Sequence, residues 1–230
     1  MFRRLSLVAA MVLCVNANAV HAQATAEEIC AQGPQLYATG QLKVAFRIFL
    51  ACAIGGDSAS QYSAAMMMRS GESTNDGTPN PFGARVFLEQ SASQGYRHAI
   101  YALGKEYDVG SVAFPHDVGL ATEMFRLAAM LGHVDAQVEL ATQYLLGRGG
   151  VPQDDHVAAQ WYERAAEAGH WGAQYLIASM YEHGNGVSRD ESLALQWYER
   201  AGHGGDEVAP LKAEQLRLRL ATKTRQLRLD

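Results

Sequence analysis

The same six residues occur twice in this chain. Gln-Trp-Tyr-Glu-Arg-Ala occupies residues 160–165 and returns at residues 196–201, 36 positions later. Similar residue types recur around both copies, with a Tyr and a Gly before a polar loop and small residues after the Trp-Tyr pair. An internal repeat with a period of 20–50 residues indicates a repeat architecture, and it constrains the fold more than any other feature of the sequence.

The repeat covers most of the chain. Successive units start at Ser60, Ala99, Ala136 and Ala173, and a further start falls at Ala209. The spacings between these starts are 39, 37, 37 and 36 residues. A partial unit precedes them, and Gly33-Pro34 interrupts its first helical pattern.

Each unit carries two apolar stripes at helical spacing. In the unit that starts at Ala173, the first stripe continues with Ile177 and Tyr181, and the second runs from Ala194 through the Trp-Tyr pair to Ala201. A stripe of this period is one face of a helix, and the glycines fall where a helix can end with positive φ. One helical hairpin cannot cover its own apolar face, so the hairpins are expected to stack into a solenoid.

Polar residues mark the predicted starts of the second helices. Asp154 and Asp190 lie where a helix N-terminus favours negative charge. Ser188 followed by Glu191 fits a capping box.

The consensus A-x3-LG-x2-Y-x2-G-x-GV-x2-D-x3-A-x2-WY-x2-AA-x2-G resembles Sel1-like repeats, which are related to tetratricopeptide repeats. The resemblance covers roughly residues 25–210 and implies an all-α, right-handed α-solenoid of stacked helical hairpins with a C-terminal capping helix. The expected organisation is a signal peptide at 1–22, an atypical N-terminal helical hairpin at 23–59, Sel1-like repeats at 60–98, 99–135, 136–172 and 173–208 within 60–210, and a basic capping helix at 211–230.

The N-terminus has the pattern of a cleavable export signal. Arg3 and Arg4 precede a largely apolar run from Leu5 to Val15, and small residues lead to a cleavage site after Ala22, with cuts after Ala19 or Ala24 as the alternatives. The run is shorter than the ~20 residues that a spanning helix needs. We therefore expect a periplasmic or secreted protein with no transmembrane segment in the mature chain.

Two cysteines, Cys30 and Cys52, remain after the expected cleavage. In an exported protein such a pair favours a disulfide, and closing this loop would contribute roughly 3 kcal/mol. Two buried thiols are the alternative.

The charge excludes one class of partner. The formal net charge is −5, and it becomes −7 when Arg3 and Arg4 are removed. Nucleic-acid binding needs a basic face, so no nucleic acid is expected. The tail is locally basic, and it is expected either to cap the last hairpin or to dock on an acidic partner or an anionic membrane surface. Its basic residues are Lys212, Arg217, Arg219, Lys223, Arg225 and Arg228.

Motifs for catalysis are absent from the sequence. It contains no Gly-x-Ser-x-Gly, no Ser-x-x-Lys and no His-Glu-x-x-His. His133 and His170 both follow a hairpin-ending glycine and are interpreted as surface-loop histidines, with a metal site as the weaker alternative. We expect no catalytic residues, no cofactor and no metal.

The resemblance also implies a binding groove, because the first helix of each tetratricopeptide-like hairpin lines the concave face. The position two residues after each unit start would point inward, and it is Tyr in three of the four units. Tyrosines are well suited to recognition, although they could instead pack between hairpins. The expected partner-binding groove comprises Tyr62, Met66, Arg69, Tyr101, Lys105, Asp108, Val138, Thr142, Tyr175, Ser179, Glu182 and His183.

By this resemblance, the expected function is that of a non-enzymatic protein-binding scaffold or adaptor. An immunity protein against an envelope-targeting secreted effector is the most specific form of that expectation. The alternative is a cell-wall-ligand binder or a β-lactamase-like enzyme of the cysteine-rich Sel1 type. Those relatives carry a disulfide in most repeats, whereas this chain can form only one from Cys30 and Cys52.

Overall fold

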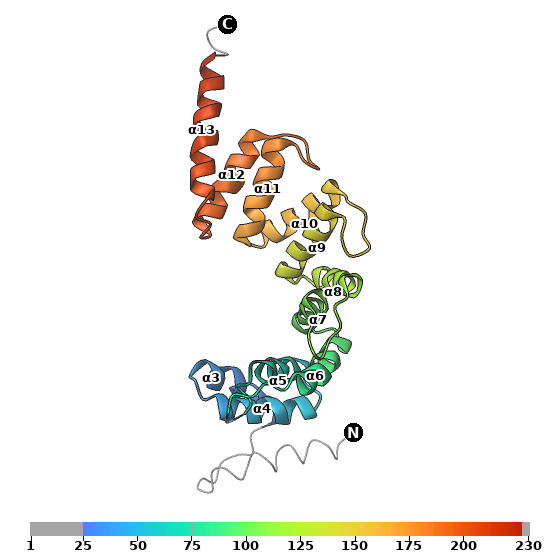
Figure 1. Cartoon of the computed structure of the whole chain (residues 1–230). Coiled ribbons are helices and arrows are strands. Elements are labelled where there is room, and N and C mark those ends of the chain that lie inside the picture. The colour runs from blue at the N-terminus through green and yellow to red at the C-terminus, as the bar shows by residue number, and fades with distance from the viewer. Residues whose placement is uncertain (1–24, 75, 227–230) are drawn as a thin grey trace. The chain divides into compact units, whose positions relative to one another are not determined.

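The structure is a computed structural model of the 230-residue chain, and it describes residues 25–74 and 76–226 (Figure 1). The expected signal peptide at 1–22 lies outside the described residues, as does Arg228 of the tail. Every regular element within the described ranges is an α-helix.

The chain divides into two compact units, an N-terminal unit that ends at His116 and a C-terminal unit that begins at Asp117. The helices of the N-terminal unit are α2 (Ala26–Cys30), α3 (Gln32–Ala38), α4 (Leu42–Ile54), α5 (Ser58–Ser70), α6 (Pro81–Ser93) and α7 (Arg97–Val109). The helices of the C-terminal unit are α8 (Val118–Met130), α9 (Val134–Leu146), α10 (Asp155–Glu167), α11 (Trp171–His183), α12 (Glu191–His203) and α13 (Ala209–Gln226).

Helices pack in chain order within each unit. In the N-terminal unit, each helix from α3 to α7 packs against the next, and α2 packs against α3 and α4. In the C-terminal unit, the series runs from α8 to α13 without interruption. The predicted all-α fold of stacked hairpins, closed by a C-terminal helix, is confirmed.

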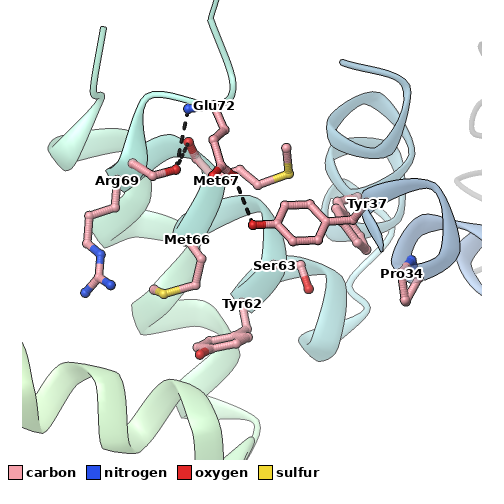
Figure 2. Close-up of a pocket in the computed structure, with 10 residues that line it drawn as sticks. Pro34, Tyr37, Tyr62, Ser63, Met66, Met67, Arg69 and Glu72 are labelled. Atoms are coloured by element: carbon pink, nitrogen blue, oxygen red, sulfur yellow. Dashed lines mark hydrogen bonds between the residues drawn. The ribbon is translucent and has the colours of Figure 1, made fainter. Parts of the chain in front are cut away.

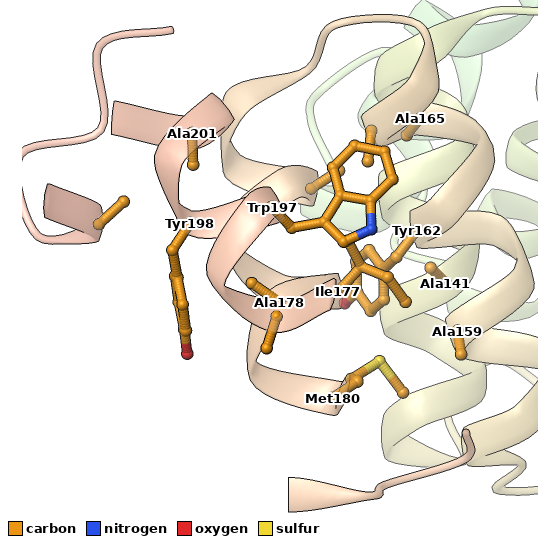
Figure 3. Packing of buried hydrophobic residues seen from close by; sticks show 14 of the residues in the cluster. Ala141, Ala159, Tyr162, Ala165, Ile177, Ala178, Met180, Trp197, Tyr198 and Ala201 are labelled. Carbon is orange, nitrogen blue, oxygen red and sulfur yellow. The ribbon is translucent and has the colours of Figure 1, made fainter. Parts of the chain in front are cut away.

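Alanines let the helices of the C-terminal unit approach closely. Ala141, Ala173, Ala178 and Ala194 have no solvent exposure. Large side chains fill the space between them, and Figure 3 shows Tyr162, Ile177, Trp197 and Tyr198 packed among the small residues. Small residues facing large ones allow the layers to interdigitate at the density of a protein interior.

The two copies of the repeated hexapeptide form the same cation–π contact. The Arg164 guanidinium lies 4.5 Å from the centre of the Trp161 ring, and Arg200 lies 4.7 Å from that of Trp197. The tyrosine of each copy is buried. The repeated residues therefore specify one local structure twice, a cation–π pair beside a buried phenol.

Aspartate side chains cap the second helices of the hairpins in the C-terminal unit. Asp154 accepts a hydrogen bond from the Val157 amide at 3.0 Å, and Asp190 accepts one from the Leu193 amide at 2.9 Å. The predicted capping box at Ser188 is wrong, because the loop continues for two more residues and α12 begins only at Glu191. Asp190 takes the extended backbone conformation of an N-cap instead.

The two histidines predicted to be loop residues are also helix caps. Nδ1 of His133 accepts the Ala136 amide at 3.3 Å, and Nδ1 of His170 accepts the Ala173 amide at 3.0 Å. His133 is only 7% exposed, so its interpretation as a surface histidine is wrong. Asp57 caps α5 in the same way, whereas Tyr96 at the equivalent position before α7 makes no side-chain cap.

A glutamine connects successive hairpins at equivalent positions. The side-chain amides of Gln61, Gln137 and Gln174 donate to the carbonyls eight residues earlier, at 3.2, 3.4 and 3.0 Å. Each bond runs from the first helix of one hairpin to the end of the preceding helix. The three bonds repeat one inter-hairpin contact along the chain.

The N-terminal hairpin is fastened covalently. A disulfide joins Cys30 to Cys52 with a Cα–Cα distance of 5.9 Å, as predicted. The bond holds the short helix α2 against α4, where Ile29 and Ile48 are also buried.

No helix in the described part of the chain is long and apolar enough to cross a bilayer.

Candidate functional site

Three of the predicted groove residues line one cavity in the N-terminal unit. Tyr62, Met66 and Arg69 follow one another along α5 at helical spacing and border a cavity of about 400 Å³ (Figure 2). The opposite wall comes from α3. The lining residues are Pro34, Tyr37, Phe49, Tyr62, Ser63, Met66, Met67, Arg69, Ser70 and Glu72.

Local sequence explains how α3 forms that wall. A β-carbon on Gly33 would lie 2.5 Å from the Phe49 ring, so the glycine lets α3 lie directly on α4. On α5, Ala64 and Met67 are buried against the hairpin, and this leaves the stripe with Tyr62 and Met66 facing the cavity. Asp57 caps the start of α5 and fixes the register of this stripe.

Two charged side chains lie at the cavity, and their partners differ. Arg69 donates to Glu106 of α7 at 2.9 Å, and the Glu106 side chain is only 14% exposed. Glu72 accepts a hydrogen bond from the Tyr37 hydroxyl at 3.2 Å, marked in Figure 2 by the dashed line that starts at Tyr37. This bond and the nearby negative charge raise the pKa of Tyr37.

Tyr62 also belongs to an aromatic cluster with residues at the start of the next hairpin. Its ring centre lies 5.6 Å from that of Tyr96 and 6.0 Å from that of His98. Burial raises the pKa of Tyr62. This tyrosine thus borders the cavity and packs between hairpins at the same time.

The α7 residues of the predicted groove are half-buried but do not line this cavity. Tyr101, Lys105 and Asp108 follow one another along α7 in the N-terminal unit. They share that helix with Glu106, which binds Arg69 of α5. The link places α7 beside the Arg69 end of the α5 stripe.

In the C-terminal unit, the predicted groove residues of α9 and α11 contact the second helices. The Thr142 hydroxyl lies 2.9 Å from the Tyr162 hydroxyl, and Val138 packs against the core. The Tyr175 ring meets the Tyr198 ring edge-on, with the centres 5.4 Å apart. Tyr175 therefore packs mainly between α11 and α12.

Glu182 lies at the centre of a charged network. The Tyr198 hydroxyl donates to it at 3.0 Å, and Arg219 of α13 donates to it at 2.6 Å. Burial opposes ionisation of Glu182, but the hydrogen bonds from Arg219 and Tyr198 outweigh it and lower the pKa of this carboxyl. Its neighbour His183 interacts through Nδ1 with the carbonyl of Ser179 at 2.8 Å.

Two arginines of the basic tail, Arg217 and Arg219, form ion pairs within the C-terminal unit. Arg217 pairs with Glu199 of α12 at 2.7 Å, and Arg219 also approaches Glu191 to 3.4 Å. The buried residues of α13 lie in its first half, at Ala209, Ala213 and Leu216. These contacts support the predicted capping role.

A second, more open cavity lies between α10 and the loop after α11. It has a volume of about 770 Å³. Glu163 on its wall accepts the Tyr181 hydroxyl at 2.9 Å, and burial together with this carboxylate raises the pKa of Tyr181 to about 12. The Nδ1–H of His156 donates to the Gly186 carbonyl at 3.0 Å.

Within residues 25–74 and 76–226, no three His, Cys, Asp or Glu side chains are grouped to hold a metal ion.

Sequence reasoning missed the α3 wall and Glu72. The partial unit before Ser60 includes Tyr37, but the groove pattern predicted from the four full units does not extend to it. The signal was available in the three consecutive methionines at 66–68, because adaptable methionines beside an irregular hairpin favour a deformable pocket.

Comparison with known proteins agrees with the repeated helical hairpins of the fold. The family model described as the Sel1 repeat matches residues 58–96, 97–133, 134–170 and 171–206. No curated protein matches the chain in sequence.

Several solved structures share the fold. A Sel1 repeat protein from Oxalobacter formigenes is 27% identical with a TM-score of 0.72, over 81% of this chain and 74% of that one. A protective antigen of uropathogenic Escherichia coli is 23% identical with a TM-score of 0.73, over 82% of this chain and 40% of that one. An immunity protein from Pseudomonas aeruginosa is 18% identical with a TM-score of 0.52, over 79% and 68% of the two chains. With four matched repeats covering more than half of its residues, the chain belongs to the Sel1 repeat family.

Proposed function

We propose that the protein is a non-enzymatic scaffold that binds a protein partner through the first helices of its hairpins. One observation carries the proposal: Tyr62, Met66 and Arg69 line a single cavity on α5. A stack of hairpins presents such side chains on rigid helices, which suits recognition of an extended segment of another protein. In the proposal, the groove residues of α7 extend this surface within the N-terminal unit, and those of α9 and α11 contribute a binding surface of the C-terminal unit.

The proposal places the scaffold outside the cytoplasm, in the periplasm or beyond the cell. The disulfide between Cys30 and Cys52 supports an oxidising compartment. The N-terminal sequence supports export through a signal cleaved after Ala22. Detecting a mature protein that starts at Gln23 in a periplasmic extract would verify both points, whereas a full-length cytoplasmic chain would refute them.

The binding role can be tested with a triple variant, Tyr62→Ala, Tyr101→Ala and Tyr175→Ala. The matched control replaces exposed apolar side chains away from the cavity, Phe82→Ala, Val86→Ala and Leu218→Ala. Quantitative affinity capture from envelope extracts should lose the partner with the first variant only. If the folded triple variant retains every partner of the wild-type protein, the proposed binding face is wrong.

As the specific role, we propose immunity against a secreted effector that attacks the cell envelope. The support is the shared fold with the immunity protein from Pseudomonas aeruginosa. A strain lacking the gene should be outcompeted by its parent in contact-dependent co-culture. Equal survival of the two strains would remove the immunity role and leave the scaffold role standing.

The C-terminal segment is proposed to be a cap that does not itself bind partners. Arg217 and Arg219 are already paired with Glu199 and Glu182 of the last hairpin. Membrane contact through 211–230 remains the competing proposal. Because Arg217 and Arg219 are held in these pairs, the protein should show no binding to anionic phosphatidylglycerol vesicles, and salt-dependent binding would favour the membrane role.

A further inference from the structure

The cavity between α3 and α5 has a mixed chemical character. Its walls are mainly apolar, from Phe49, Met66, Met67 and the rings of Tyr37 and Tyr62. Its volume of about 400 Å³ falls within the range of roughly 300–1,000 Å³ of small ligand sites. A large aromatic or unbranched apolar side chain fits these dimensions, and the methionines can adapt to its shape.

The charges at the cavity are unequally compensated. Arg69 is neutralised by Glu106 at 2.9 Å. The Glu72 carboxylate accepts from the Tyr37 hydroxyl, which is a neutral donor, at 3.2 Å. The local balance is therefore negative, and the chain as a whole carries a net charge of −5. A carboxylate beside an apolar cavity favours a ligand with a cation next to its apolar group.

The position of Glu72 is fixed by both walls. It follows directly after α5, while its partner Tyr37 projects from α3 across the cavity (Figure 2). Gly71 takes a φ of 84° at this point, and a β-carbon on it would lie 2.1 Å from the Gly77 carbonyl oxygen. The turn that directs Glu72 to the cavity thus depends on a glycine and on the loop that follows.

We infer that this cavity recognises an extended protein segment that carries a large apolar side chain next to Lys or Arg. The apolar side chain enters between Tyr62, Met66 and Tyr37, and the cation pairs with Glu72. This inference rests on the proposed scaffold function and names the chemistry of its partner. The N-terminal hairpin, which holds α3, then forms one wall of the site.

Synthetic peptides test the inference directly. The probes are acetylated and amidated hexapeptides with Gly-Gly flanking either Phe-Arg, Phe-Glu or Ala-Arg. The readout is the methyl resonances of ¹³C-labelled methionines in the intact protein. Met66 and Met67 report on the cavity, and Met180, buried in the C-terminal unit, is the internal reference.

The Phe-Arg peptide should shift the Met66 and Met67 signals and leave Met180 unchanged. The other two peptides should bind about tenfold more weakly, since each lacks one of the two interactions. Equal binding of the three peptides, or no shift at millimolar concentration, would overturn the inference.

Variants separate the two parts of the site. Glu72→Gln should abolish the preference for Arg over Glu while keeping the preference for Phe over Ala. The matched control is Glu89→Gln, which removes an exposed carboxylate that pairs with Arg85 on α6 outside the cavity. Circular dichroism confirms that both variants are folded. Retention of the Arg preference in Glu72→Gln would show that Glu72 is not the cation subsite.

The peptide experiment and the test of the scaffold function can give opposite outcomes, so the two proposals are tested independently. If the peptides show no selectivity while the tyrosine triple variant still loses its partner, the proposed cavity chemistry is wrong and the scaffold stands. If selectivity depends on Glu72 but the triple variant keeps every partner, the cavity chemistry holds and the proposed scaffold face is wrong.

Discussion

Gly149 lies directly on Thr122, so closely that a β-carbon on the glycine would lie 1.8 Å from the threonine hydroxyl oxygen. Gly186 occupies the equivalent position one unit later, where a β-carbon would lie 2.1 Å from the Asp155 carbonyl oxygen. In both cases the loop after a first helix presses against the start of the second helix of the preceding hairpin. The glycines allow this contact because any side chain would occupy the same space.

The neighbouring Gly150 provides a matched control for the first prediction. Both glycines have positive φ, of 66° and 81°, but a β-carbon on Gly150 meets nothing within 4 Å. Gly150→Ala should cost about 1 kcal/mol from backbone strain alone. Gly149→Ala should cost roughly 3 kcal/mol, because the clash with Thr122 adds to the strain. Urea unfolding followed by tryptophan fluorescence measures both, as all the tryptophans lie in the C-terminal unit. Equal costs would contradict the tight contact.

The histidine caps lead to a second prediction. His170→Ala should lower the free energy of unfolding by about 1 kcal/mol, because the Ala173 amide loses its acceptor. His170→Asn should be nearly neutral, since Asn is a good N-cap and adds no negative charge beside Asp135, which lies 3.6 Å from His170. The same urea experiment distinguishes the two variants. A loss of equal size in both would mean that His170 acts through packing and not through its cap.

The third prediction concerns pH and the attachment of α13. Because the pKa of Glu182 is lowered from its ordinary value of 4.5, its pairing stabilises the fold above that pH and is lost as pH falls through the folded pKa. Arg219→Gln should therefore cost about 1 kcal/mol at pH 7, a value limited by the half-exposed arginine. The cost should shrink in acid, as the pH falls below 4.5 and through the lowered pKa of Glu182. Arg225→Gln, farther along α13, is the control and should change stability little at either pH.

Reducing the disulfide gives the fourth prediction. Loss of the bond between Cys30 and Cys52 should destabilise the N-terminal hairpin by roughly 3 kcal/mol. Thermal unfolding followed by circular dichroism, with and without dithiothreitol, measures the change. The Cys30→Ser, Cys52→Ser double variant should match the reduced protein and should not respond to the reductant. A response of the double variant would show that the reductant acts elsewhere.

The sequence predicted the hairpins well because the repeat encodes their packing. The Trp161 and Trp197 copies form the same cation–π contacts, and the intervening alanines are buried as the stripes require. Cap identity was harder to predict. Ser188 fitted a capping box in sequence, but the length of the loop decided that Asp190 begins the helix.

The candidate site was only partly predictable, because equivalent positions meet different neighbours. Tyr62 and Tyr175 occupy the same position in their units. Tyr62 borders a cavity that the α3 wall closes, whereas Tyr175 meets the ring of Tyr198. Whether a tyrosine faces a ligand space or a helix depends on the residues of adjacent hairpins, and a single repeat unit does not contain that information.

The recurring glutamine contact has a consequence for how such chains lengthen. Gln137 and Gln174 each reach back to a main-chain carbonyl, which every residue type supplies, so the acceptor does not depend on the sequence of the preceding hairpin. A duplicated gene segment of one period would encode both the new hairpin and the bond that attaches it to its predecessor. Growth of the array by tandem duplication therefore requires no compensating substitution at this joint.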